Sequence, residues 1–269
     1  MSLVITQEVQ KRDRVMVMFG LVGVIVLSWA YTLYMAWGMD MAMGSDMAMG
    51  SDMHMHGAML TTWPPMRFLM MFVMWSVMMI AMMAPTVWPA VLMFATINRQ
   101  RNQQDNPFVP TTLFFLGYLL VWVGYCLLAT IIQWALQQAT LLSSGMVLTN
   151  AYLSGGVLIA AGLFQWTSIK RACLSKCRAP HDFMSNQWQK KESGAFSMGL
   201  QHGIECVMSC WLLMLLLFVA GVMNLLWMGA ITALILIEKM VPAGDKVAKL
   251  SGLLFIVCGV LVIVTNTTF

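Results

Sequence analysis

Long runs of apolar residues alternate with short polar segments along most of the chain, which is typical of a protein that crosses a membrane several times. A helix needs about 20 residues to cross a hydrocarbon core about 30 Å thick. Backbone polar groups in lipid must be satisfied internally, so each run is predicted to be helical. The pattern predicts an all-α, polytopic membrane protein, a single domain over 1–269. Its predicted spans, about seven, are 15–37, 66–97, 111–137, 150–169, 198–220, 225–240 and 250–266.

The second apolar run and the apolar stretch that begins with the fifth are both longer than one membrane span requires. The second carries Pro85 and Pro89, so we expect a kink near its inner end or a continuation as an interfacial helix. Residues 198–240 are almost continuously apolar. We predict a hairpin that turns around Gly221 to Asn224, because one unbroken helix would place the lysines that follow it outside the cell.

Basic residues set the predicted orientation through the positive-inside bias. With the amino terminus inside, fourteen of the 15 Lys and Arg residues fall in the cytoplasm, and only Arg67 lies outside. Composition agrees, since 60% apolar and 10% charged residues exclude both a soluble domain and a disordered chain. The positive-inside bias accounts for the net charge of +4. We therefore expect the lipid bilayer as a partner and no nucleic acid. The predicted location is the bacterial inner membrane, with several passes.

A methionine-rich segment separates the first two runs. The chain holds 29 Met, and residues 40–57 read DMAMGS DMAMGS DMHMHG within a predicted outer loop over 38–62. Thioether sulfur selects Cu(I), and imidazole also binds copper. The alternative is a low-complexity loop without a ligand. The candidate ligands in this outer loop are Met41, Met43, Met47, Met49, Met53, His54, Met55 and His56.

The methionine pattern continues into the second run at steps of four residues, which lie along one face of a helix. It could form a thioether ladder that leads inward, or simply adaptable packing of the kind that Met provides in apolar helices. The positions at these steps are Met66, Met70, Met74, Met78 and Met82.

Four of the six cysteines and two of the four histidines fall between positions 173 and 210, around a predicted cytoplasmic loop over 170–197. The segments CLSKCRAPH and HGIECVMSC each space their Cys and His four residues apart, so neighbouring pairs share a helix face. His202 and Cys210 are separated by about 12 Å of helical rise. Cys206 therefore joins either the other three cysteines in a thiolate site or His202 in one of two adjacent sites. With Glu205, an ionisable residue near the membrane, the candidate ligands are Cys173, Cys177, His181, His202, Glu205, Cys206 and Cys210.

The chemistry of this cluster indicates a metal. Thiols at the cytoplasmic face stay reduced, so a disulfide framework is not expected. Thiolates suit Cu(I), zinc or an iron–sulfur cluster, and the methionine segment on the other face favours copper as Cu(I) over zinc. Cys126 and Cys258 are interpreted as packing residues, and Glu238 with Lys239 as a structural pair.

Several motifs together resemble a known family. They are MMIAMMAP at 78, GLFQWTSIKRACLSKCRAP at 162, HGIECVMSCWLLM at 202 and GVMNLLWM at 221, followed by Glu238-Lys239. They resemble the predicted metal-binding integral membrane proteins of bacteria over most of residues 66–266. The resemblance implies metal ligands at Cys173, Cys177, Cys206 and Cys210, with His202 as their companion. The chain departs from that pattern at Ser209, where the family usually has another Cys, and at His181, which has no regular counterpart.

These observations favour a copper-handling protein that binds, takes up or relays the ion between the outer loop and the inner site. The alternatives are a copper-dependent membrane redox enzyme or a subunit of one, and a membrane scaffold with a structural zinc site. No Walker loop, dinucleotide fingerprint or nucleophile elbow is present, so ATP-driven pumping and the common hydrolase classes lack support. No sequence feature excludes the redox enzyme, and an enzyme is the less favoured interpretation. Expected partners are the metal ion and a periplasmic or cytoplasmic metallochaperone.

Overall fold

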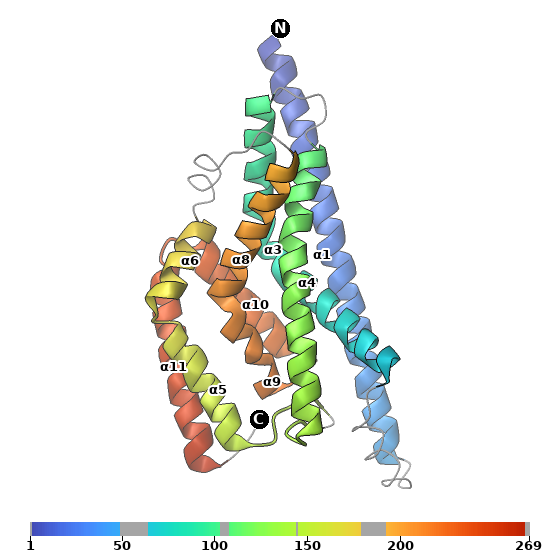
Figure 1. Cartoon of the computed structure of the whole chain (residues 1–269), viewed down its shortest axis with the longest axis vertical. Helices are drawn as coiled ribbons and strands as arrows, with labels where there is room; N and C mark the ends of the chain where they lie inside the picture. The colour runs from blue at the N-terminus through green and yellow to red at the C-terminus, as the bar shows by residue number, and fades with distance from the viewer. Residues whose placement is uncertain (1, 49–63, 103–107, 144, 179–191, 267–269) are drawn as a thin grey trace.

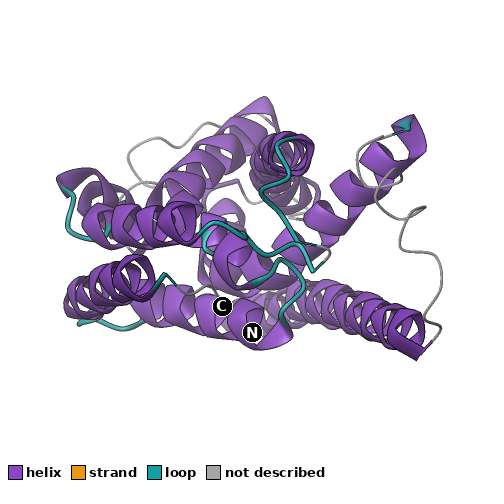
Figure 2. Ribbon diagram, turned by 90° about the horizontal axis from the view of Figure 1, so that it is seen from below, coloured by secondary structure: helices purple, strands orange, loops and turns teal. Residues whose placement is uncertain are grey.

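Helices make up almost all of the described part of the chain in the computed structural model (Figures 1 and 2). The structure describes residues 2–48, 64–102, 108–143, 145–178 and 192–266, and side chains within them over 15–38, 64–98, 110–143, 145–178 and 193–266. The predicted all-α class is confirmed. The helices are α1 (Ser2–Ala48), α3 (Pro65–Asn102), α4 (Phe108–Gln138), α5 (Ala151–Phe164), α6 (Ser168–Arg178), α8 (Glu192–Leu215), α9 (Leu217–Ala220), α10 (Leu225–Met240) and α11 (Gly244–Thr265).

Five helices in the described part of the chain are long and apolar enough to cross a membrane, or six if the bent pair α5–α6 is one span. The prediction of about seven spans is therefore not confirmed. The predicted span 150–169 is broken by a bend of 63° between α5 and α6. The predicted span 225–240 is α10, whose 16 residues rise only about 24 Å and fall short of the hydrocarbon thickness. The five spans are Val15–Gly38, Pro65–Asn98, Pro110–Gln138, Ser193–Ala220 and Gly244–Thr265.

The predicted turn after the fifth run is confirmed. Gly221 ends α9 with a φ of 99°, a left-handed value that glycine adopts without a steric penalty. Asn224 then caps α10, and its side chain accepts hydrogen bonds from the backbone N–H groups of Leu226 and Trp227. In Figure 1 the chain reverses here, so α10 returns alongside α8 toward α6.

Four helices, α1, α3, α6 and α8, extend further than the sequence predicts. α3 continues as one helix through Pro85 and Pro89 as far as Asn102, and Figure 1 shows it running obliquely at first and then nearly parallel to α1. α1 continues through Ala48, so the first part of the predicted loop 38–62 is helical. The end of α6 and the start of α8 likewise occupy both ends of the predicted loop 170–197.

Small residues let the central helices approach closely. Along the α4–α8 crossing, a Cβ atom at Gly117 or at Gly199 would overlap backbone atoms of the facing helix. Gly155 and Gly259 play the same part between α5 and α11, which lie side by side in Figure 1. Glycine contacts of this kind are a common way to pack helices in membranes. The close α4–α8 crossing fixes Tyr118, the residue after Gly117, against α8.

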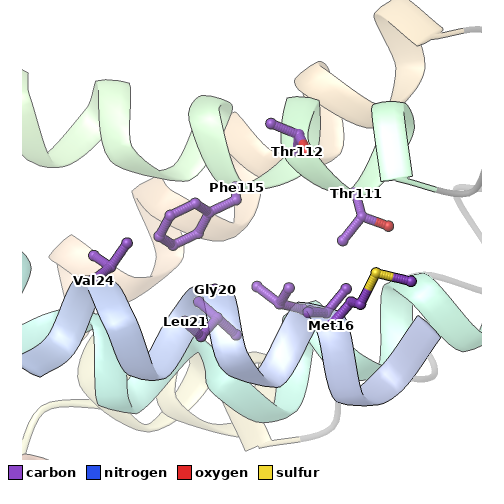
Figure 3. A pocket seen from close by; sticks show the side chains of 9 residues that line it. Met16, Gly20, Leu21, Val24, Thr111, Thr112 and Phe115 are labelled. Carbon is purple, nitrogen blue, oxygen red and sulfur yellow. The ribbon is translucent and has the colours of Figure 1, made fainter. Parts of the chain in front are cut away.

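A cavity of about 400 Å³ lies between α1, α3 and α4 (Figure 3). Leu21 and Val24 of α1 and Phe115 of α4 are among the nine residues that line it, and none of the nine is a Cys or a His. Its lining is apolar apart from two threonines of α4, and Met16 supplies the one sulfur atom among the nine residues, so this cavity offers a single donor for a copper ion.

Candidate metal centre

Cys206 lies where three helices meet. Its side chain projects from α8 and the residue is only 2% exposed. Lys239 of α10 donates a hydrogen bond from Nζ to Cys206 Sγ at 2.8 Å, and the Tyr118 hydroxyl of α4 lies 3.3 Å from the same sulfur. Lys239 is half-buried, and a cysteine sulfur beside an ammonium group is a good position for a thiolate.

Cys210 follows Cys206 by one turn of α8, on the same face of the helix. It is buried, its Sγ donates a hydrogen bond to the Cys206 carbonyl oxygen at 3.0 Å, and the two thiols interact with one another. The sequence spacing of four residues predicted this juxtaposition. The pair therefore offers two neighbouring sulfur donors.

α3 contributes a thioether and a hydroxyl beside this pair. Lys239 Nζ lies 3.5 Å from Thr86 Oγ1, which in turn lies 4.0 Å from Met83 Sδ. The Tyr118 hydroxyl lies 3.5 Å from the Met83 carbonyl oxygen. Met83 also comes last along the chain in a buried methionine series on α3 that includes Met74, Met78, Met79 and Met82. The first two members of the predicted ladder, Met66 and Met70, are exposed instead.

His202 lies one turn before Cys206 on α8 and is buried. Its ring packs beside Phe114 and Tyr118, with centroids 6.0 and 5.9 Å away. Its Nδ1 atom has no hydrogen-bond partner among the described residues. Buried polar atoms are normally paired, so this nitrogen is a candidate third donor.

Cys173 and Cys177 project from α6, which packs against α8 and lies outside the five spans. Both are half-buried. Cys177 is close enough to Lys239 and Cys206 to interact electrostatically with both. Burial raises the pKa of the Cys177 thiol to about 12 and also raises the pKa of Cys173. Both thiols are therefore protonated at neutral pH without a metal, and binding one would release protons.

Glu205 has another partner. Its Oε1 lies 3.2 Å from Lys176 Nζ of α6, while its Oε2 has no hydrogen-bond partner among the described residues. The remaining predicted ligands cannot be placed: His181 lies outside the described residues, as do Met49, Met53, His54, Met55 and His56, and the side chains of Met41, Met43 and Met47 on α1 are also outside them. Across the described ranges, no group of three or more His, Cys, Asp and Glu side chains is arranged to hold a metal.

The prediction that Glu238 and Lys239 form a structural pair is wrong. Glu238 accepts hydrogen bonds from Lys170 at 2.7 Å and from Gln165 at 2.9 Å, in a buried cluster. Successive residues on a helix point about 100° apart, so Lys239 faces Cys206 instead. The sequence analysis missed Lys239 and Tyr118 as members of the cysteine site. A lysine in an apolar helix was the available signal, because such a charge in a membrane needs a functional partner.

Comparison with protein families gives one match relevant to this site. The model of a family described as PpoB2, copper chaperone, matches residues 72–262. The match covers most of the chain and includes all four cysteines of the predicted cluster. Curated proteins and solved structures give no match. The chain therefore belongs to the PpoB2 family of copper chaperones.

Proposed function

We propose that this protein is a membrane-embedded copper chaperone that carries Cu(I) as its cargo on the thiolates of Cys206 and Cys210. The single observation that carries this proposal is the 2.8 Å contact between Lys239 Nζ and Cys206 Sγ, in a buried site with a second thiol one turn away. Sulfur donors suit soft metals, of which Cu(I) is one and zinc is another. Family membership supports copper as the cargo.

Charge balance favours Cu(I) at this pair of cysteines. Two thiolates and one Cu(I) ion together carry a net charge of −1, which the Lys239 ammonium group neutralises. Zn²⁺ on the same two thiolates would be neutral by itself, so Lys239 would leave a net charge of +1. Uncompensated charge is costly in a buried environment. The same lysine that holds the cargo-free thiolate thus favours a monovalent ion.

Two neighbouring atoms are candidates to complete the coordination. His202 Nδ1 is buried and has no hydrogen-bond partner among the described residues. Met83 Sδ is linked to Lys239 through Thr86. Both are neutral donors, so either can bind the ion without changing the charge balance, whereas the Glu205 carboxylate would change it.

Transfer of the cargo follows from the exposure of the cysteines. Cys206 and Cys210 are buried, and Cys177 and Cys173 on α6 are half-buried. We propose that Cu(I) passes between the buried pair and a cytoplasmic metallochaperone or metalloprotein by ligand exchange through Cys177 and then Cys173. Each exchange replaces one sulfur donor by another, so the ion is never released into water.

The proposed topology has the amino terminus inside a bacterial inner membrane. Its support is the basic face around α6 and the positive-inside bias. This orientation puts the Met and His residues of segment 38–62 on the outer side, where they would capture copper. Cu(I) at the thiolates and an outer capture segment together make a path from outside to inside.

Metal loading of the purified full chain tests the proposal. We expect Cys206→Ser and Cys210→Ser each to lose at least tenfold in Cu(I) affinity, measured by competition with a chromophoric Cu(I) chelator. Cys126→Ser is the matched control, because Cys126 is as buried as Cys206 and makes none of the hydrogen bonds described for Cys206 and Cys210. A double Cys206→Ser, Cys210→Ser variant that keeps the wild-type load, or a chain that retains zinc in preference to copper, would overturn it.

A further inference from the structure

Two methionine sulfur atoms lie beside a buried glutamine of α4, at a site separate from Cys206. Gln133 of α4 is 0% exposed, and its Nε2 donates to Met146 Sδ at 3.3 Å and to Met71 Sδ at 3.8 Å. Its Oε1 accepts a hydrogen bond from Trp75 Nε1 at 2.6 Å. Both thioether sulfurs therefore face the same nitrogen atom. Thioether sulfur is a weak hydrogen-bond acceptor, so the Gln133 N–H groups donate to two weak acceptors.

The backbone holds Met146 in this position against its own preference. Met146 has a φ of 57°, a left-handed conformation that a residue with a side chain seldom adopts. The segment around it is closed by a bridge between Leu142 and Leu148, and Leu148 is anchored by a hydrogen bond to the Phe218 carbonyl oxygen at 2.9 Å. Strain of this kind concentrates at binding sites, where surrounding contacts enforce it.

The Gln133 group lies about 18 Å along α3 from the cysteine site, with buried methionines between them in the sequence. Met71 and Met83 are separated by twelve residues, or about 18 Å of helical rise. The buried methionines Met74, Met78, Met79 and Met82 lie between them in the sequence of the same helix. The glutamine group and the cysteine pair are thus at opposite ends of one thioether-rich stretch. In Figure 1 the connection between α4 and α5, which carries Met146, lies at the lower end of the molecule, where α1 also ends.

We propose that Met71 and Met146 form a second Cu(I) site, at which the ion displaces the Gln133 amide group from between the two sulfurs. This inference rests on the proposed function, because it makes the site the entry point for cargo that later reaches Cys206 and Cys210. Two neutral thioethers leave the +1 charge of Cu(I) uncompensated, so they bind the ion more weakly than two thiolates do. They bind hard cations such as Mg²⁺ and Ca²⁺ poorly, because these prefer oxygen ligands. The order of affinity therefore directs the ion toward the cysteines.

Methionine methyl NMR of the full chain in lipid nanodiscs tests the site, with Ag(I) as a diamagnetic soft ion in place of Cu(I). The chain carries Cys173→Ser, Cys177→Ser, Cys206→Ser and Cys210→Ser, which removes all four cysteines of the proposed Cu(I) path, and signals are assigned with single Met→Leu variants. We expect the Met71 and Met146 methyl signals to shift together and to saturate with one Ag(I) ion. Unchanged Met71 and Met146 signals at saturating Ag(I), or shifts with separate saturation, would overturn the site.

Variants separate this inference from the proposed function. Met146→Leu should abolish the Ag(I)-dependent shift of Met71, whereas the buried control Met198→Leu should not. Met146→Gly removes the same sulfur while relaxing the left-handed backbone, so it guards against misfolding of the leucine variant. With its cysteines intact, Met146→Leu should retain Cu(I) affinity at the thiolates but load them at least tenfold more slowly. An unchanged loading rate would exclude an entry site. The proposed function fails separately, if Cys206→Ser with Cys210→Ser leaves the Cu(I) affinity of the chain unchanged.

Discussion

Replacing Lys239 by Met removes the charge that balances the proposed Cu(I) thiolate complex. The ammonium nitrogen lies 2.8 Å from Cys206 Sγ, so we place it about 4 Å from the centre of a complex with net charge −1. At an effective dielectric constant of about 20, that attraction is about 4 kcal/mol. This attraction is an upper bound on the change in binding, because the same ammonium group also stabilises the cargo-free Cys206 thiolate. Lys239→Met should therefore raise the Cu(I) dissociation constant by at least tenfold and at most about a thousandfold. Met is chosen because it fills a similar volume with an apolar side chain.

Competition with a chromophoric Cu(I) chelator measures this change on the purified protein, together with the ratio of bound zinc to copper. Lys239→Met should raise that ratio, because the neutral zinc complex no longer faces a positive charge. Lys246→Met is the matched control, since Lys246 is an exposed lysine at the start of α11. A Lys239→Met variant whose Cu(I) affinity stays within threefold of wild type would refute the charge-balance reasoning.

Three further predictions concern the scaffold and the outer segment. Gly117→Leu should destabilise the fold by about 1–3 kcal/mol through overlap with α8, seen as a lower Tm, while Gly124→Leu, with open space around it, should not. Lys170→Met should cost about 3–5 kcal/mol because it leaves buried Glu238 unpaired, and Lys170→Met with Glu238→Met should recover most of it; equal Tm values for the two would contradict this. Deleting residues 40–57 should lower copper uptake by cells without changing the Cu(I) affinity of the purified protein, and unchanged uptake would remove the outer segment from the path.

Hydropathy predicted which segments are helical, but it could not predict which of these helices are long and straight enough to span a membrane. The turn at Gly221 and Asn224 was predictable because a glycine and a capping residue mark it locally. The bend between α5 and α6 depends on tertiary contacts: Gln165 turns inward to Glu238 and Ser251, on elements far away in the sequence. An apolar run of residues 150–169 carries no sign of those contacts.

The spacing of cysteines predicted the Cys206 and Cys210 pair, because residues four apart share a helix face. It could not predict the partners that lie across helix crossings. Tyr118 reaches Cys206 only because α4 and α8 pack closely, and Lys239 does so because α10 folds back beside α8. The predicted participation of Glu205 as a ligand competes with its ion pair to Lys176, which again depends on how α6 docks.

X-ray absorption at the copper edge, on the copper-loaded full chain, tests the thiolate assignment most directly. We predict a Cu(I) edge with thiolate sulfur as the dominant ligand, and loss of the thiolate scattering when Cys206 and Cys210 are both replaced by serine. Copper coordinated only by nitrogen and oxygen, or a sulfur signal that is unchanged in the double variant, would contradict it.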